Sequence, residues 1–447
     1  MTSSVASARQ DERRVISNVT KGSIGNLIEW YDWYTYAAFS VYFAATFFPE
    51  GNATAQLLNT AAIFAVGFLM RPIGGWLLGC FADRYGRRTA LTWSVTMMAL
   101  SSLLIAVTPG YDMIGAAAPI MLVLARLLQG LSVGGEYATS ATYLSEVASA
   151  GRRGFYSSFQ YVTLIAGQLV ALGLLIVLQL LLTEQQLAGW GWRIAFGIGG
   201  LGAVVVMYLR RSMDESVSFR AEFQRAGGAA SRRGQLRVLG RHWRECLLVT
   251  GLTLGGTVAF YTYTTYLQKF MHLTSGIPNR TVTLINFAAL VVFVALQPVL
   301  GSLSDRIGRR PLLLFFGISG TALTVPLLTL LASTRNPLVG FAVMLAGLVI
   351  VSGYTSINAI VKAELFPTGI RALGVGLPYA LTVAIFGGTT EYIALALKTA
   401  GRESVFFYYV AGCVLISLLV YMSMRETSRN SPLDATAAGP VAATSSG

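Results

Sequence analysis

The sequence predicts an all-α polytopic membrane protein, with twelve transmembrane helices in two pseudo-symmetric six-helix bundles. Three observations predict this fold: an apolar composition, an alternation of basic and non-basic loops, and an internal repeat. Of the 447 residues, 54% are hydrophobic and only 12% are charged. Soluble proteins carry about 25% charged residues, so much of this chain must face lipid or other buried helices.

Twelve apolar stretches are long enough to cross a bilayer, which takes about 20 helical residues. We expect the spans at 19–47, 57–82, 90–109, 116–145, 155–182, 190–210, 245–271, 281–304, 311–332, 337–363, 371–397 and 403–424. The expected domains are a cytoplasmic N-terminal tail, a first bundle, a cytoplasmic linker, a second bundle and a disordered cytoplasmic tail, at 1–18, 19–210, 211–244, 245–425 and 426–447.

The distribution of positive charge predicts the orientation, because Lys and Arg concentrate in cytoplasmic loops. Every even-numbered gap between spans is basic, and the stretch from Arg210 to Arg244 contains nine arginines, these two included. Both termini are therefore expected in the cytoplasm. The net charge of +13 then reflects topology, and neither a nucleic acid nor an obligate protein partner is expected.

An internal repeat relates the two halves. The first copy follows span 2 and consists of Gly79, Asp83, Arg84, Gly86, Arg87 and Arg88. The second copy follows span 8, 222 residues later, and consists of Gly301, Asp305, Arg306, Gly308, Arg309 and Arg310. A second pair, Glu146 with Arg153, recurs as Glu364 with Arg371, at an offset of 218 residues. Two matches at nearly one offset indicate duplication, with halves related by an axis along the membrane normal.

The repeated motif has a physical interpretation. Its glycine lets a neighbouring helix approach closely, and its aspartate can accept hydrogen bonds from arginines and from the N-terminus of a facing helix. A single copy could be no more than a basic turn. Two copies in register favour a gating or packing role at the cytoplasmic side.

The doubled motif resembles the signature loop of the major facilitator superfamily. Within that superfamily, three further stretches resemble the metabolite:proton symporters: 25–32, 68–75 and 126–137. Two others, 154–165 and 386–392, are similar to the branch of 2-oxoglutarate permeases. The resemblance implies symport of a dicarboxylate with protons in a bacterial inner membrane, with small carboxylate and protons as partners and no cofactor.

Ionisable residues inside spans are the candidate functional residues, because each costs at least about 2.5 kcal/mol at mid-bilayer. The candidates are Glu29, Asp32, Arg71, Arg126, Glu136 and Glu391. Arg71 precedes Asp83 by a helical distance of about 18 Å, so it lies near mid-bilayer. It can bind substrate, satisfy carbonyls freed by Pro72, or pair with Glu29.

Asp32 and Arg126 are expected at a similar depth, where the resemblance implies that their spans line a cavity. Burial favours a neutral aspartate, whereas a neighbouring arginine favours the charged form. A substrate carboxylate that competes for Arg126 would thus let Asp32 take up a proton, with Glu29 as the substitute carrier one turn away. The alternative is a static salt bridge that fixes helix packing.

A dicarboxylate needs at least two strong donors. Arg71 and Arg126 are predicted to supply them, with Tyr261 and Gln268 as contacts from the second half. Lys269 is expected to snorkel to the surface or to contact the anion, and Lys362 is a further possible anion contact. We expect the proton and anion chemistry to depend mainly on the first half, with shape, hydroxyls and the moving gate from the second.

Other signals are excluded. Gly197, Gly199 and Gly202 fit a dinucleotide-binding pattern, but they lie inside an apolar span, so we interpret them as helix-packing glycines. No phosphate-binding loop, paired cysteines or metal-ligand pattern is present, and no enzyme is expected. The alternatives to 2-oxoglutarate are citrate, shikimate, proline or betaine on the same machinery, and a transporter-like nutrient sensor.

Overall fold

The computed structural model describes residues 27–85, 87–134, 151–211, 239–367 and 370–428, and these ranges are almost entirely helical with no β-strand. Contacts between residues divide the chain into two units, each described by itself below. The first unit comprises Met1–Gly135 and Thr163–Ala230, and the second comprises Glu136–Val162 and Ser231–Gly447. The unit boundary therefore falls within α7 (Arg153–Leu181).

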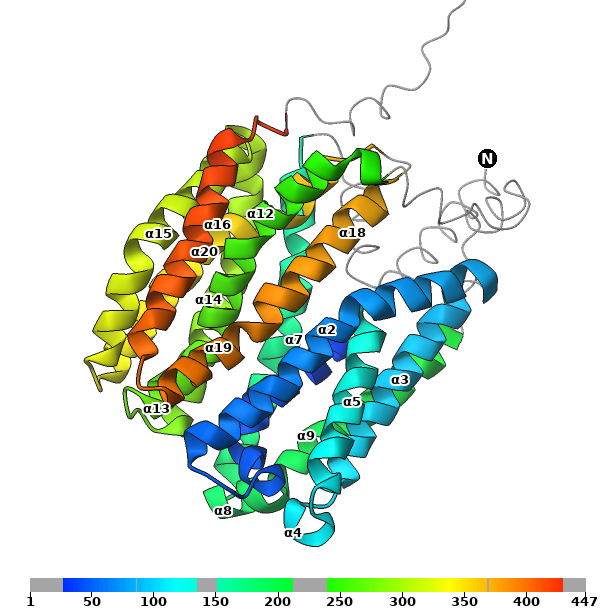
Figure 1. The fold of residues 1–447 in the computed structure, drawn as a ribbon, viewed down its shortest axis with the longest axis vertical. Helices are drawn as coiled ribbons and strands as arrows, with labels where there is room; N and C mark the ends of the chain where they lie inside the picture. The colour runs from blue at the N-terminus through cyan, green and yellow to red at the C-terminus, as the bar shows by residue number, and fades with distance from the viewer. Residues whose placement is uncertain (1–26, 86, 135–150, 212–238, 368–369, 429–447) are drawn as a thin grey trace, which may run out of the picture. The chain divides into compact units, whose positions relative to one another are not determined.

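The first unit is built around the helix at 27–47. Its other long helices are α2 (Ala53–Tyr85), α3 (Arg87–Val107), α5 (Ala117–Val133), the part of α7 after residue 162, and α9 (Trp192–Arg211). Short connections are α4 (Tyr111–Ile114), α8 (Glu184–Gln186) and the π-helical turn η1 (Leu187–Gly191). α2 packs on α5, and α3 packs between α5 and α9 (Figure 1).

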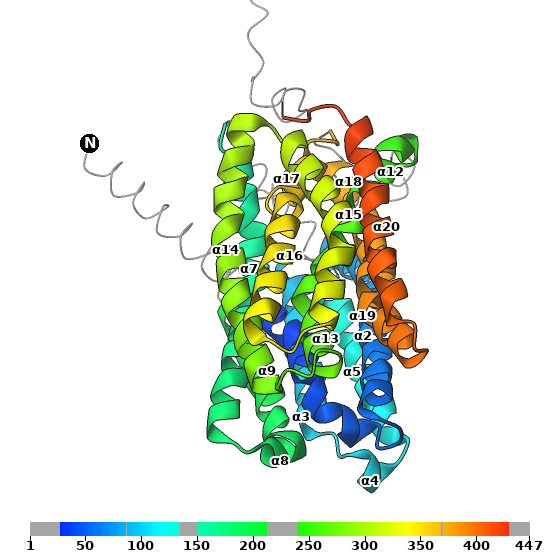
Figure 2. The ribbon, with the colours of Figure 1, turned by 90° about the vertical axis from the view of Figure 1, so that its left-hand side faces the viewer.

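The second unit contains six spans, three of them interrupted. α12 (Trp243–Tyr261), the π-helix η2 (Thr262–Tyr266) and α13 (Leu267–Leu273) form one span. The next are α14 (Asn279–Ile307), α15 (Arg310–Ala332), and α16 (Pro337–Thr355) followed by α17 (Asn358–Ala363). The last are α18 (Arg371–Thr382) with η4 (Val383–Gly387) and α19 (Gly388–Thr399), and then α20 (Glu403–Ser423). α16 packs against α14 and α15, and α15 packs against α20 (Figure 2).

The twelve expected spans all have counterparts in the described residues. Nine helices there are long and apolar enough to cross a membrane, and Thr92–Val107 and Ala117–Val133 are shorter apolar helices. The helix at 27–47 is the twelfth. Residues 19–26 and 135–145, expected in spans 1 and 4, lie outside the described residues, as does most of the linker.

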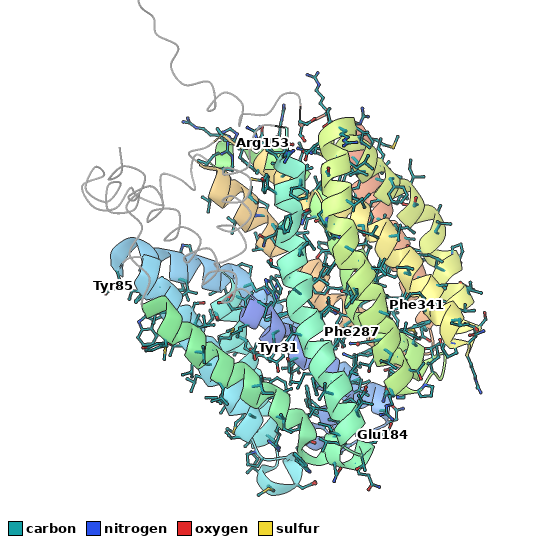
Figure 3. All side chains as sticks on the ribbon, turned by 180° about the vertical axis from the view of Figure 1, so that it is seen from behind. Tyr31, Tyr85, Arg153, Glu184, Phe287 and Phe341 are labelled. Carbon is teal, nitrogen blue, oxygen red and sulfur yellow. The ribbon has the colours of Figure 1, made fainter. Side chains whose placement is uncertain are left out.

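α7 illustrates how the predicted boundaries compare with the structure. Arg153 lies at one end of this continuous helix, and Glu184 lies just beyond the other end (Figure 3). The expected span was 155–182, so each boundary differs by one or two residues. Its apolar residues set the length, because the run must match the hydrocarbon thickness of a bilayer.

Candidate functional site

Two buried arginines share an aromatic box in the first unit. Arg71 on α2 lies with its guanidinium carbon 3.8 Å from the ring centre of Trp33 and 4.2 Å from that of Phe68. Arg126 on α5 lies 4.2 Å from Trp33 and 4.3 Å from Tyr36. Each such cation–π contact contributes about 0.5–2 kcal/mol, which partly offsets the cost of burying two like charges.

Neither guanidinium is fully hydrogen-bonded. Arg71 is 6% exposed and Arg126 is completely buried. The Nε and Nη2 atoms of both arginines have no acceptor among the residues that the structure describes. A buried donor without an acceptor costs about 1–3 kcal/mol, and more when it is charged. The box is therefore suited to an anion that supplies several acceptor oxygens.

Arg126 is connected to Asp32 through Gln129. Nη1 of Arg126 donates to Oε1 of Gln129, and Nε2 of Gln129 donates to Oδ2 of Asp32 at 2.7 Å. Ser102 donates to the other carboxylate oxygen of Asp32. The sequence left open a direct salt bridge between Asp32 and Arg126. Instead Gln129 lies between them, because it projects from α5 one turn after Arg126 and fills that space.

Glycines allow α2 and α5 to approach at the level of the arginines. A Cβ atom on Gly130 would lie 2.1 Å from the carbonyl oxygen of Gly67, and one on Gly134 would lie 2.0 Å from that of Arg71. No side chain fits at such distances. Both glycines belong to the 126–137 stretch, so part of that stretch serves helix packing around the box.

Asp32 is enclosed on its other side by α9. A Cβ atom on Gly199 would lie 2.7 Å from Oδ1 of Asp32, and one on Gly202 would contact Ile28. The interpretation as helix-packing residues is confirmed for these two glycines, but it is wrong for Gly197, where a Cβ atom would meet no neighbour within 4 Å. Glu29 is also buried, one turn from Asp32, whereas Glu136 lies outside the described residues.

Tyr261 and Gln268 are located in the second unit. Tyr261 is 5% exposed and stacks edge-to-face on Phe260. Gln268 accepts a hydrogen bond from Asn286 at 2.8 Å. Their predicted substrate contacts stay predictions.

The second unit also contains buried charge, although we expected the proton and anion chemistry to depend mainly on the first half. Lys269 is 1% exposed and forms an ion pair with Glu391 on α19. The expectation that Lys269 snorkels to the surface is therefore wrong, because a buried carboxylate neutralises it in place. Lys362 is completely buried, with its Nζ 3.7 Å from the ring centre of Tyr379.

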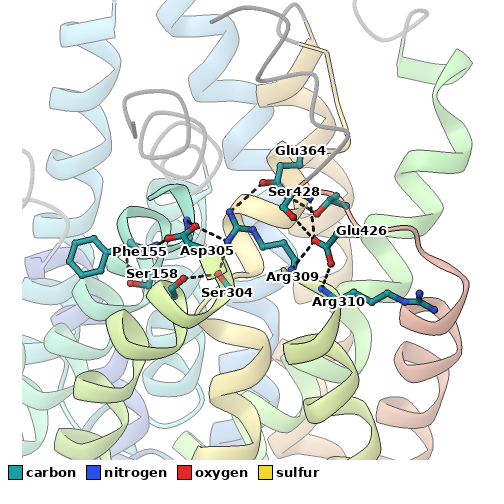
Figure 4. A network of polar contacts seen from close by, with 12 residues as sticks. Phe155, Ser158, Ser304, Asp305, Arg309, Arg310, Glu364, Glu426 and Ser428 are labelled. Carbon is teal, nitrogen blue, oxygen red and sulfur yellow. Dashed lines mark hydrogen bonds and ion pairs between the residues drawn. The ribbon is translucent and has the colours of Figure 1, made fainter. Parts of the chain in front are cut away.

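The second copy of the repeated motif forms a polar network within the second unit (Figure 4). Asp305 accepts hydrogen bonds from the backbone N–H groups of Gly154 and Phe155, at 2.8 and 2.9 Å, in the first turn of α7. Arg309 donates to Asp305 at 2.9 Å. The prediction that this aspartate accepts from the N-terminus of a facing helix and from an arginine is confirmed. Gly301 permits the contact, since a Cβ there would lie 2.6 Å from the Gly154 oxygen.

The polar network extends from Arg309 to Glu364, which with Arg371 forms the second predicted pair of the repeat. Arg309 lies 3.6 Å from Glu364, and Thr427 donates to the other oxygen of Glu364 at 2.5 Å. Burial raises the pKa of the Glu364 carboxyl, although the Arg309 charge and the Thr427 hydroxyl act against it. Arg371 donates to the carbonyl oxygens of Ala363 and Phe366. Of the remaining motif residues, Arg306 is exposed, and Arg310 donates to the carbonyl of Met422 at 2.8 Å.

Glu426 caps the start of α15. It accepts from the backbone N–H groups of Arg309 and Arg310, at 2.8 and 3.0 Å. Burial acts to raise the pKa of Glu426, but these donors and those of Ser428 outweigh it and hold the pKa below its usual value. Gly308, with φ at +95°, makes the turn beneath this carboxylate. The first residues of the tail expected to be disordered therefore make specific contacts.

The first copy of the motif is less fully described. Its backbone runs through the end of α2 and the start of α3. Gly86 and Glu146 lie outside the described residues, as do the side chains of Asp83, Arg84, Arg87 and Arg88. Arg153 lies at the start of α7.

Sequence reasoning missed the side chains that surround the charges at the site, namely Trp33, Tyr36, Phe68, Ser102 and Gln129. Gln129 follows Arg126 by three residues, so helical spacing places both side chains on one face, and that signal was available. Trp33 follows Asp32 directly. Ser102 lies on another span and carries no local signal.

Comparisons with known proteins agree with this architecture. The family model described as "Sugar (and other) transporter" matches residues 19–237 and 232–434. The alpha-ketoglutarate permease of Escherichia coli is 50% identical over 419 residues, covering 94% of this chain and 96% of the permease. The citrate-proton symporter of Klebsiella pneumoniae is 33% identical, covering 90% of each chain. A crystal structure of a D-xylose-proton symporter superimposes with a TM-score of 0.72 at 18% identity, covering 92% of this chain and 98% of that one.

These matches cover both halves of the chain, and the solved structure shares the fold. The relatives are membrane transporters and not enzymes. The chain belongs to the sugar (and other) transporter family, within the major facilitator superfamily.

Proposed function

We propose that the protein imports a small dicarboxylate, 2-oxoglutarate in the first instance, together with protons by alternating access. The relatives named for alpha-ketoglutarate and for citrate with protons support a carboxylate substrate. We place the protein in a bacterial inner membrane with both termini in the cytoplasm, on the strength of the basic even-numbered loops.

One observation carries the choice of a dianion: the two buried guanidiniums of Arg71 and Arg126, with donors left unpaired on one aromatic box. A carboxylate can accept two parallel N–H bonds from an arginine. A dianion satisfies both arginines and balances both charges, whereas a zwitterion such as betaine brings one carboxylate and an extra positive charge.

The chain from Arg126 through Gln129 to Asp32 supplies the proton coupling. In the structure, Nε2 of Gln129 donates to an Asp32 oxygen, which suits an ionised carboxylate. When a substrate carboxylate binds Arg126, the positive charge that stabilises ionised Asp32 is shared with the substrate. Asp32 then takes up a proton more readily, so binding of the anion and of the proton are linked.

The network around Asp305 is proposed as a latch that forms and breaks during the cycle, together with its first copy at Asp83. The carboxylate of Asp305 meets the positive end of the α7 dipole, an interaction that is lost once these groups separate. Alternating access requires contacts of this reversible kind at the cytoplasmic side.

Substrate binding by the purified protein tests the dianion assignment. We expect wild type to bind 2-oxoglutarate, and Arg71→Gln to weaken it about 100-fold, as expected for two lost charged hydrogen bonds. Arg71→Lys should retain part of the affinity, because lysine keeps the positive charge but lacks the two parallel N–H donors of the guanidinium. The matched control is Arg280→Gln, which removes an exposed cation.

The alternatives predict different results. If glycine betaine binds and Arg71→Gln leaves its affinity within about threefold, the protein is a zwitterion transporter and the dianion assignment is wrong. Binding of citrate in preference to 2-oxoglutarate would keep the site and change the substrate. A nutrient sensor would bind tightly without any uptake.

A further inference from the structure

The buried ion pair of Lys269 and Glu391 belongs to the second unit, whereas the arginine box belongs to the first. Lys269 is on α13 and Glu391 on α19, 122 positions apart in the sequence. Both residues are at most 3% exposed. Only Oε1 of Glu391 meets the lysine, and Oε2 is buried with no hydrogen-bond donor among the residues that the structure describes. This carboxylate is therefore only half satisfied.

Each partner lies within four residues of the end of a π-helical turn. η2 ends at Tyr266, three residues before Lys269, and η4 ends at Gly387, four residues before Glu391. A π-turn shifts the register of the residues after it and is found often at functional sites. Two such turns occur on neighbouring spans, and each precedes one member of the buried pair. This arrangement favours a functional role for the pair over a packing role alone.

A second ion pair nearby provides a contrast. Lys398 lies 3.1 Å from Glu403, and Thr274 also donates to Glu403, at 2.7 Å. Both side chains of this pair are 18% exposed. This pair is only partly buried and its carboxylate also accepts a hydrogen bond from Thr274, so Lys398–Glu403 behaves as an ordinary structural contact.

Among the residues that the structure describes, few charged or titratable groups face Glu391. They are Lys269 on α13 and Tyr266 on η2, whose hydroxyl lies 3.3 Å from Glu403 on α20. Within the described part of the chain, Lys269 is the group that compensates the charge of Glu391. Loss of the negative charge on Glu391 would therefore leave Lys269 as a buried cation in need of an anion.

We propose that Lys269 and Glu391 form a second, proton-linked carboxylate site. Glu391 takes up a proton at its unpaired Oε2, the ion pair breaks, and Lys269 binds a carboxylate of the transported anion in its place. The inference rests on the proposed function in that the anion is a carboxylate. It gives the second unit a proton carrier and an anion-binding cation of its own.

The test measures 2-oxoglutarate binding and the number of protons taken up per anion, by calorimetry in buffers of different ionisation enthalpy. The variants are Lys269→Met, Glu391→Gln and the double variant that combines these two substitutions. Lys398→Met is the matched control. Thermal unfolding in detergent reports stability separately. Failure of wild type to bind 2-oxoglutarate would count against the proposed function. The affinities and proton uptake of the variants, compared with wild type, test this inference.

We expect Glu391→Gln to bind the anion at least as tightly as wild type, with about one proton fewer taken up. Lys269→Met should weaken binding at least tenfold, and the double variant should be stable yet stay weak in binding. Lys398→Met should leave both quantities unchanged.

The proposal is overturned if the double variant recovers wild-type affinity and proton uptake, because the pair is then a static structural contact. It is also overturned if Glu391→Gln takes up as many protons as wild type. This second result decides the matter even if Lys269→Met does not fold.

Discussion

At the residue scale, Gln129 has the most informative position. An amide side chain has one end that accepts and one that donates, and here the accepting end faces Arg126 while the donating end faces Asp32. This orientation suits a charged arginine and a charged aspartate together. Once Asp32 is protonated, it accepts a weaker hydrogen bond from the Gln129 amide. The amide is then held less firmly in this orientation, and its hydrogen bond to Arg126 weakens.

We predict that Gln129→Leu uncouples transport from the proton gradient. Leucine fills a similar volume but cannot connect Arg126 to Asp32. Gradient-driven uptake of 2-oxoglutarate should fall at least tenfold, since two charge-assisted hydrogen bonds are lost, while exchange of internal for external anion persists. Radiolabelled flux into proteoliposomes measures both.

The matched control is Ser94→Ala, which removes a hydrogen bond to Ser132 between α3 and α5 without touching the chain to Asp32. Equal loss of driven uptake and of exchange in Gln129→Leu would show that Gln129 serves folding or binding alone.

At the scale of helices, the end of α20 and the start of α15 are joined by one carboxylate. Glu426 satisfies two backbone N–H groups that the first turn of α15 would otherwise leave unpaired. The negative charge also lies at the positive end of that helix.

We predict that Glu426→Gln lowers the midpoint of thermal unfolding by about 2 °C at neutral pH, allowing for partial exposure. The pKa of Glu426 is lower in the folded protein, so its stabilising effect is present above the unfolded pKa of about 4.3. That effect disappears as the pH falls through the lower folded value. The gap between wild type and variant should therefore be constant from about pH 5 to 8 and close in more acidic buffer.

Glu50→Gln, which alters an exposed carboxylate, should show no gap at any pH. A gap for Glu426→Gln that widened on acidification would contradict the assigned charge state.

Helix boundaries could be predicted from the sequence, but interruptions could not. Runs such as 311–332 agree with Arg310–Ala332 because hydropathy and flanking charge are local signals. No local signal distinguishes the π-turns: η4 reads VAIFG, like ordinary apolar helix, and η2 reads TYTTY inside an otherwise apolar span. The same limit applies to Lys269, whose partner Glu391 is far away in the sequence.

At the scale of the whole molecule, the two units bury different charged groups. The first unit places two guanidiniums beside a carboxylate, and the second places a lysine against a glutamate. The sequence identified Arg71, Arg126 and Asp32 because charge inside a span is conspicuous. It could not show which side chains separate or pair them, since that depends on contacts among helices distant in the sequence.

The central claim is that a proton gradient drives the entry of a dicarboxylate. Proteoliposomes with labelled 2-oxoglutarate outside test it directly. We predict faster uptake and accumulation when the outside is acidic, and loss of the difference when a protonophore is added. Saturable uptake that is the same with and without the gradient would contradict the account and indicate a uniporter.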